Sequence, residues 1–60
     1  MMNDLTQHGF IKSTKTGYIF EKVLATGTVL RADDEGRCVA ESSSGKWLWT
    51  LPIRFCLSIE

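Results

Sequence analysis

The segment 42–46 (SSSGK) contains a Gly-Lys pair after three serines, residue types that cradle anions in phosphate-binding loops. A nucleotide triphosphatase loop also needs a glycine five residues before the Gly-Lys pair and a hydroxyl residue after the lysine. Ala40 and Trp47 occupy those two positions, and no helix pattern follows. We therefore interpret the segment as a hairpin loop whose serines bind nearby backbone, with a looser anion site as the alternative.

Few residues of the chain could form a metal centre or a nucleophilic site. His8 is the single histidine, Cys38 and Cys56 are distant in sequence, and the acidic turn 33–35 lacks the ligand pattern of a calcium loop. A cysteine or serine nucleophile would need His8 as its base, and nothing in the sequence brings them together. The sequence thus predicts no enzyme, no catalytic residue, no metal site, no cofactor and no small-molecule substrate.

Aromatic and basic side chains are concentrated in the segment 46–55 (KWLWTLPIRF). If the segment is a strand, Trp47 and Trp49 share one face. We expect both to be core residues, with the alternative that one stays at the rim as an anchor, because Trp and Arg recur at interface hot spots. The predicted partner-binding residues are Lys46, Trp47, Trp49, Arg54 and Phe55.

A second hypothesis assigns the same aromatic residues to stacking on single-stranded nucleic acid. The basic residues around them would be Lys12, Lys15, Lys22, Lys46 and Arg54. Seven basic and seven acidic residues give a net charge of zero, whereas nucleic-acid binders usually need a basic excess for counterion release. We therefore expect a non-catalytic interaction module that binds a larger protein or a second copy of the chain through the region 47–55 or through a C-terminal edge strand. Nucleic acid is the alternative partner.

Five glycines punctuate the chain at residues 9, 17, 27, 36 and 45, in steps of 8, 10, 9 and 9. Each of the last four closes a short polar cluster, namely STKTG, ATG, DDEG and SSSG. Glycine adopts positive φ at little cost, which suits it to tight turns. Turn signals at this spacing between β-branched and aromatic runs predict consecutive antiparallel strands.

The runs between the glycines supply the expected strands. Residues 28–33 and 37–42 flank the DEG loop and form the clearest predicted hairpin. The segment 46–50 follows the serine loop as the next strand. Pro52 cannot donate to a ladder, so it marks a break, a bulge or an edge.

Three segments at or near the ends of the chain complete the prediction. The segment 53–60 (IRFCLSIE) alternates strictly, which predicts a half-buried strand at the end of the sheet. Its apolar face would contain Ile53, Phe55, Leu57 and Ile59, and its other face Arg54, Cys56, Ser58 and Glu60. The segment 18–25 (YIFEKVLA) is interpreted as a strand, with a helix as the alternative. A short helix is expected to begin at Asn3 or Asp4 and to end at Gly9.

The predicted fold is mainly β: one domain over residues 1–60, a small antiparallel meander or SH3-like barrel of about five strands after a short N-terminal helical segment. The alternative is an α+β fold with 18–25 helical. The N-terminal residues lack the features of a signal peptide, and no apolar run approaches the ~20 residues that span a bilayer. We therefore expect a cytoplasmic protein with no membrane partner, in which Cys38 and Cys56 are free, partly buried thiols.

Overall fold

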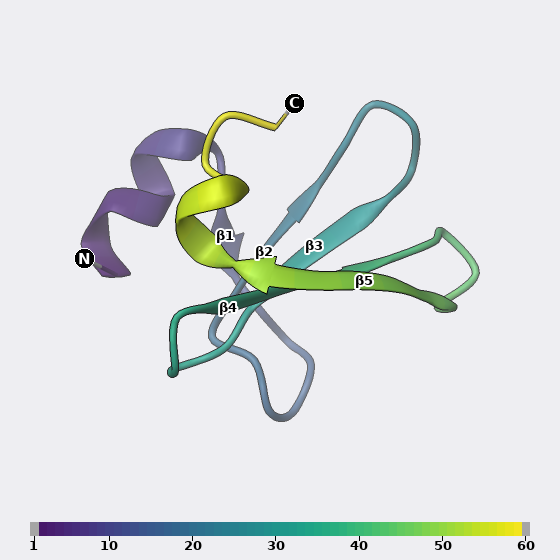
Figure 1. Cartoon of the computed structure of the whole chain (residues 1–60), viewed down its shortest axis with the longest axis horizontal. Coiled ribbons are helices and arrows are strands. Elements are labelled where there is room, and N and C mark those ends of the chain that lie inside the picture. Colours follow the sequence, from purple (N-terminus) through teal and green to yellow (C-terminus); the bar gives the residue numbers. More distant parts are fainter. Residues whose placement is uncertain (1, 60) are drawn as a thin grey trace.

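The computed structural model describes residues 2–59, and the side chains of residues 5–59, as a five-stranded antiparallel sheet in the order β1-β2-β3-β4-β5 (Figure 1). The elements are η1 (Met2–His8), β1 (Ile11–Lys12), β2 (Phe20–Val23), β3 (Val29–Ala32), β4 (Arg37–Glu41), β5 (Trp47–Pro52) and η2 (Ile53–Phe55), where η denotes a 3-10 helix. The mainly β meander with an N-terminal helical segment is thus confirmed. β1 and β5 lie at opposite edges, so the sheet is open and does not form the closed barrel.

β2 to β5 follow the predicted ranges closely, whereas no strand was predicted at β1. β2 lies within 18–25, so the alternative with a helix in that segment is wrong. β3 and β4 lie within 28–33 and 37–42 and pair as the expected hairpin. β5 continues past the expected 46–50 and ends at Pro52. Among residues 2–59, no helix is long and apolar enough to cross a membrane.

Three hairpin loops of the meander, 24–28, 33–37 and 42–46, share one geometry that repeats every nine residues. In each loop the first residue donates its N–H to the carbonyl of the fifth, over 2.8 to 3.0 Å. The fourth residue is always glycine, with φ between +80° and +91°. A left-handed residue at this place closes a three-residue hairpin loop in the twist that the flanking strands require. The glycine spacing therefore sets the positions at which the chain reverses.

The core lies on one face of the sheet, under η1 and the segment that follows β5. Figure 1 shows these two terminal segments next to one another at one end of the molecule. The fully buried hydrophobic residues are Leu5, Phe10, Leu30, Ala32, Cys38, Ala40 and Cys56. Of the side chains that β3 and β4 contribute to this core, three are small: Ala32, Cys38 and Ala40. The terminal segments can therefore approach the sheet closely.

η1 ends in a Schellman motif at Gly9, as its sequence predicts. Gly9, at φ +88°, donates its N–H to the carbonyl of Thr6 over 3.4 Å, and Phe10 donates to the carbonyl of Leu5 over 3.1 Å. Leu5 and Phe10 are both buried, which supplies the apolar contact that usually accompanies this motif. η1 already includes residues 3 and 4, so it begins before the expected start at either of them. Their side chains lie outside the described part of the chain.

Lys22 ties both terminal segments to the sheet. It lies on the core face of β2, opposite Leu30. Its Nζ donates to the carbonyl of His8, at the end of η1, and to the carbonyl of Ile59, each over 2.8 Å. The ammonium group also lies 5.9 Å from the centroid of the Phe10 ring. The charge is therefore satisfied by carbonyl dipoles and an aromatic face.

Residues 53–59 do not form the strand that was predicted for 53–60. After Pro52 the chain makes one turn of 3-10 helix and then folds back across the core. Cys56 is 0% exposed, and Ile53 and Leu57 pack against the core cluster. These three residues are spaced i, i+3 and i+4, which is a helical periodicity. The strict alternation placed Cys56 on the polar face, and that assignment is wrong.

Candidate interaction surface

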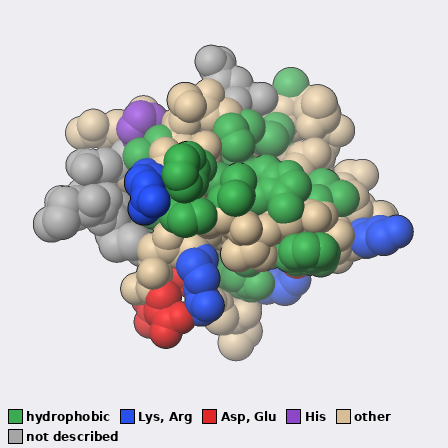
Figure 2. Space-filling model, viewed as in Figure 1, with side chains coloured by type: hydrophobic (Ala, Val, Ile, Leu, Met, Phe, Trp, Pro, Cys, Tyr) green, Lys and Arg blue, Asp and Glu red, His purple; other side chains and the backbone are tan. Residues whose placement is uncertain are grey.

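Large hydrophobic side chains are exposed close together on β5 and η2. Trp47 is 60% exposed, Leu48 42%, Leu51 41% and Phe55 55%. They are four of the seven large hydrophobic residues that are exposed among residues 5–59. Figure 2 shows hydrophobic side chains gathered over β5 and η2. We call the surface formed by these four side chains the β5–η2 surface; exposed apolar patches of this kind mark interaction sites.

A β-bulge puts the two tryptophans on opposite faces of the sheet. Trp49 pairs with Ala40, whereas Trp47 pairs with Glu41, so Leu48 is an extra residue on β5. Ala40 points into the core and Glu41 points to the other face. The expectation that Trp47 and Trp49 share a face is therefore wrong, because one inserted residue reverses the alternation. Trp49 packs against the core cluster.

The Trp47 side chain is held in place although it is exposed. Its indole Nε1 donates to Thr50 Oγ1 over 3.0 Å. In a regular strand these two residues, three apart, would lie on opposite faces, and the bulge brings them to the same one. An aromatic side chain that is already fixed loses little entropy when it binds, which suits it to the role of an anchor.

The backbone edge of β5 is poorly suited to accepting another strand. Ile53 donates its N–H to the carbonyl of Gly36 over 2.8 Å, toward β4. Because backbone groups alternate along a strand, those of Thr50 and Pro52 point to the open edge. Pro52 has no N–H, and a bulge lies at the other end of β5. Both features hinder edge-to-edge pairing, so side chains dominate what β5 offers to a partner.

Basic residues flank the β5–η2 surface. Lys46 precedes β5 and is exposed, and Arg54 lies in η2 with its guanidinium carbon 4.7 Å from the centroid of the Phe55 ring. Among residues 5–59, neither Lys46 nor Arg54 forms an ion pair. Figure 2 shows basic side chains at either end of the hydrophobic area. Residues 46–59 contain no acidic residue. Of the acidic side chains on the neighbouring strand and loop, Glu41 and Glu35 are already paired with Arg31 and Arg37.

Two of the basic residues proposed for nucleic-acid binding have partners within the fold. The Lys15 Nζ lies 3.2 Å from Glu41 Oε2 and 5.8 Å from the centroid of the Tyr18 ring. Lys22 donates to the two backbone carbonyls described above. Neither ammonium group is a free phosphate ligand, which lowers the charge that this chain could offer to a nucleic acid.

The sheet face opposite the core contains a charge network around Arg31. The guanidinium contacts Glu41 through Nη1, and its Nε lies 3.6 Å from Glu21 Oε1. Ser13 Oγ donates to the same Glu21 oxygen over 2.9 Å. Together with Lys15, the network contains two cations and two carboxylates. Its charges compensate one another, which is typical of a structural cluster.

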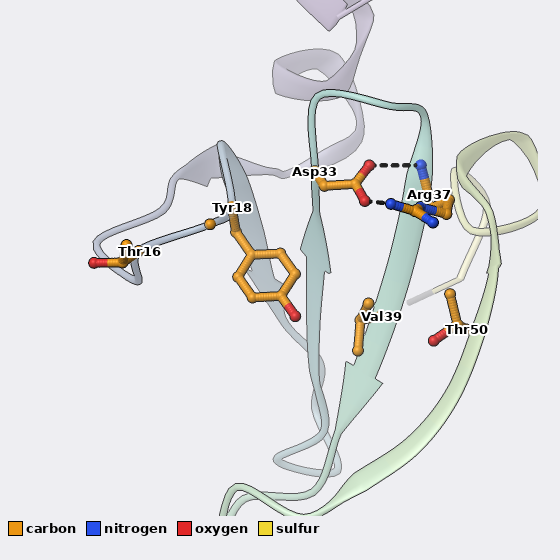
Figure 3. A pocket seen from close by; sticks show the side chains of 7 residues that line it. Thr16, Tyr18, Asp33, Arg37, Val39 and Thr50 are labelled. Carbon is orange, nitrogen blue, oxygen red and sulfur yellow. Dashed lines mark hydrogen bonds and ion pairs between the residues drawn. The ribbon is translucent and has the colours of Figure 1, made fainter.

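A shallow pocket of about 430 Å³ opens beside this network (Figure 3). Its lining residues are Thr16, Gly17, Tyr18, Asp33, Arg37, Val39 and Thr50. Arg37 binds Asp33 through its backbone N–H and its Nε, over 2.9 and 3.0 Å, and also contacts Glu35. Burial raises the pKa of Asp33, but the hydrogen bonds from Arg37 and Glu35 outweigh it and lower the pKa below its ordinary value. The charged pair in this pocket thus stays ionised and mutually satisfied.

The two cysteines are buried neighbours in the core. Cys38 and Cys56 are both free and 0% exposed. Burial, and a hydrogen bond with Cys56, raise the pKa of the Cys38 thiol to about 12. Burial also raises the pKa of Cys56, against the lowering effect of the same hydrogen bond. Thiols that stay protonated away from solvent are poor nucleophiles.

The structure brings most of the predicted partner-binding residues to one part of the molecule. Trp47 and Phe55 form the β5–η2 surface, Lys46 and Arg54 flank it, and Trp49 packs on the core. Sequence reasoning missed Leu48 and Leu51, since an apolar residue in a strand is more often buried than exposed.

No protein-family model, no curated protein and no solved structure matches the chain. The geometry of the chain itself is therefore the basis on which a function is proposed.

Proposed function

We propose that the protein is a non-catalytic interaction module that binds a larger protein, or a second copy of itself, through the β5–η2 surface. The observation that supports this most directly is the exposure of Trp47, Leu48, Leu51 and Phe55 within nine residues of one edge strand and the turn after it. Keeping such side chains in water is costly for a small domain, and a partner that covers them recovers that free energy.

The chemistry of the other side chains fits a binding role. The two thiols are buried with raised pKa values, and Arg37 and Asp33 neutralise each other in the pocket of Figure 3. His8, the single histidine, is exposed at the end of η1. These placements do not provide a nucleophile with an oriented base, which hydrolytic catalysis requires.

Nucleic acid remains the second proposed partner, with less support. The cations available to it are mainly Lys46, which directly precedes the exposed Trp47, Arg54 in η2, and Lys12 on the opposite edge strand β1. This version predicts quenching of tryptophan fluorescence by single-stranded oligonucleotides, with an affinity that falls steeply as salt rises.

The proposal is tested by sedimentation at a series of protein concentrations together with affinity capture from cell extract. The wild type is compared with the double variant Trp47→Ala/Phe55→Ala. The expected result is self-association, or capture of a defined protein, that the double variant loses. Val23→Ala is the matched control, because Val23 is 65% exposed on β2, away from the β5–η2 surface.

The proposal is contradicted if the wild type is monomeric throughout and captures the same proteins as the double variant. It is also contradicted if Val23→Ala reduces binding as much as the double variant does, since the β5–η2 surface would then have no special role. Circular dichroism of each variant shows whether the fold is retained.

A further inference from the structure

We infer that the occupant of the β5–η2 surface is an apolar segment of another protein with acidic residues at its ends. This inference rests on the proposed function and specifies the partner. The surface has an apolar middle, from Trp47 to Leu51, and a cationic side chain at each end, Lys46 and Arg54. Acidic groups on a partner are complementary to both ends.

A second copy of the chain does not supply those acidic groups through the same surface. Residues 46–59 contain Lys46 and Arg54 and no acidic residue. When two copies of β5 face one another, in either direction and in any register, no opposite-charge pair can form between these segments. Like charges placed opposite one another are destabilising. Charge pairing between the two segments therefore does not favour a symmetric dimer, and the carboxylates of Asp33 and Glu35, in the loop beside η2, are already paired with Arg37.

The shape of the surface favours a polypeptide over a lipid bilayer. The bulge sends Trp47 to one face of the sheet, while Leu51 pairs with Cys38 on the core face. The exposed side chains thus wrap around the edge of the sheet instead of lying in one plane. A flat bilayer surface would contact only part of them, whereas a polypeptide can follow the edge. The Trp47 indole N–H is also occupied by Thr50, so it is not available to headgroups.

Backbone pairing contributes little to this recognition. The edge is interrupted by Pro52 and by the bulge at Leu48, as described above. Recognition then depends on apolar side chains that straddle the edge and on acidic side chains that reach Lys46 and Arg54. β5 has six residues, which span about 20 Å, and η2 adds a single turn, so an extended peptide of about 12 residues, about 40 Å long, is long enough to contact both cations.

The test is a selection of random 12-residue peptides displayed on phage, against the full-length wild type and against Lys46→Glu/Arg54→Glu. The wild type is expected to enrich peptides with an apolar middle and Asp or Glu toward the ends. The charge-reversed variant is expected to enrich Lys or Arg at those places. Both substituted residues are exposed and outside the core, so the fold should be retained; circular dichroism checks this.

Affinity measurements on the most enriched peptide complete the test. Charge reversal at both positions should weaken binding by roughly 3- to 10-fold, and raising the salt should reduce this difference. The inference is overturned if the wild type enriches peptides without acidic residues, or if the wild type and the charge-reversed variant enrich the same peptides. In either case the β5–η2 surface remains the proposed interaction surface. A wild-type dimer that Trp47→Ala dissociates also overturns it and supports the proposed function with a second copy as partner.

Two further outcomes count against the inference. Binding to vesicles of phosphatidylglycerol and phosphatidylcholine without any peptide enrichment identifies a membrane as the occupant. Absence of peptide enrichment, vesicle binding and self-association overturns both the inference and the proposed function. The two failures are thus distinguishable.

Discussion

Lys22 gives the sharpest prediction about how so small a chain stays folded. Lys22→Met keeps most of the aliphatic stem but removes the ammonium group that binds the carbonyls of His8 and Ile59. Hydrogen bonds from a charged donor contribute about 1.5–3 kcal/mol each, and the contact with the Phe10 ring about 0.5 kcal/mol. Because the bond to His8 is exposed, we expect a combined loss of about 2–3 kcal/mol.

This loss is large compared with the whole stability of the domain. A chain of 60 residues has a free energy of unfolding of about 3–9 kcal/mol. The expected decrease in melting temperature is about 10–20 °C, since 1 kcal/mol corresponds to about 4–8 °C in a domain of this size. Urea denaturation followed by tryptophan fluorescence measures the difference, with Lys12→Met as the matched control because Lys12 is exposed on β1.

Hydrogen exchange distinguishes loss of the two Lys22 hydrogen bonds from a general destabilisation of the core. In Lys22→Met the amides of Phe10 and Ile59 should lose protection, while those of Leu30 and Ala40 lose only as much as global stability requires. A stability equal to that of Lys12→Met, with unchanged protection of both terminal segments, would refute the role assigned to Lys22.

Three further predictions concern pH and backbone geometry. The pKa of Cys38 is raised from 9.0 to about 12, so its thiol ionises first in the unfolded state. The free energy of unfolding should therefore fall as pH rises from about 9 toward 12, by up to about 1.4 kcal/mol per pH unit. If the free energy of unfolding falls with pH equally steeply in the wild type and in Cys38→Ala, measured by denaturation at pH 8 to 10.5, this prediction is contradicted. The pKa of Asp33 is lowered, so the ionised carboxylate stabilises the fold above pH 3.8, and this stabilisation is lost as pH falls through the folded-state pKa. In acid unfolding, Asp33→Asn should therefore lose less stability over this range than the wild type does. Gly45 has φ +91° and open space around its Cβ position. Gly45→Ala should therefore lower the free energy of unfolding by about 1–2 kcal/mol, from the backbone conformation alone. Gly9→Ala should lower the free energy of unfolding, measured by urea denaturation, more than Gly45→Ala does, because the new Cβ would lie 3.3 Å from Lys22 Cε. An equal decrease for the two variants would mean that the contact with Lys22 is unimportant.

The meander was predictable from sequence because its turns depend on local residue choice. Glycine at the fourth place of 24–28, 33–37 and 42–46 encodes the same left-handed loop residue three times. Runs of β-branched and aromatic residues between such loops have few alternatives to antiparallel pairing. The same reasoning identified 42–46 as a hairpin loop, in which the Gly45 N–H donates to the Ser42 carbonyl.

The arrangement of the C-terminal part was not predictable with the same rules. The prediction for 53–60 used the alternation of residue types and did not consider the helical spacing of Ile53, Cys56 and Leu57. After Pro52 the chain forms a 3-10 turn, and the helical spacing determines which of these side chains are buried. The bulge at Leu48 has no distinct residue signature, yet it determines which face Trp47 occupies. The bonds of Lys22 are to backbone carbonyls, which no side-chain pattern reports.

The central claim is that the β5–η2 surface is where a partner binds. It is tested most directly by ¹⁵N chemical-shift mapping of the protein during titration with the most enriched 12-residue peptide. The predicted result is that the largest shifts fall on residues 46–55, including the Trp47 indole N–H. Shifts centred on the pocket around Tyr18 and Arg37, or no localised shifts at all, would contradict the account.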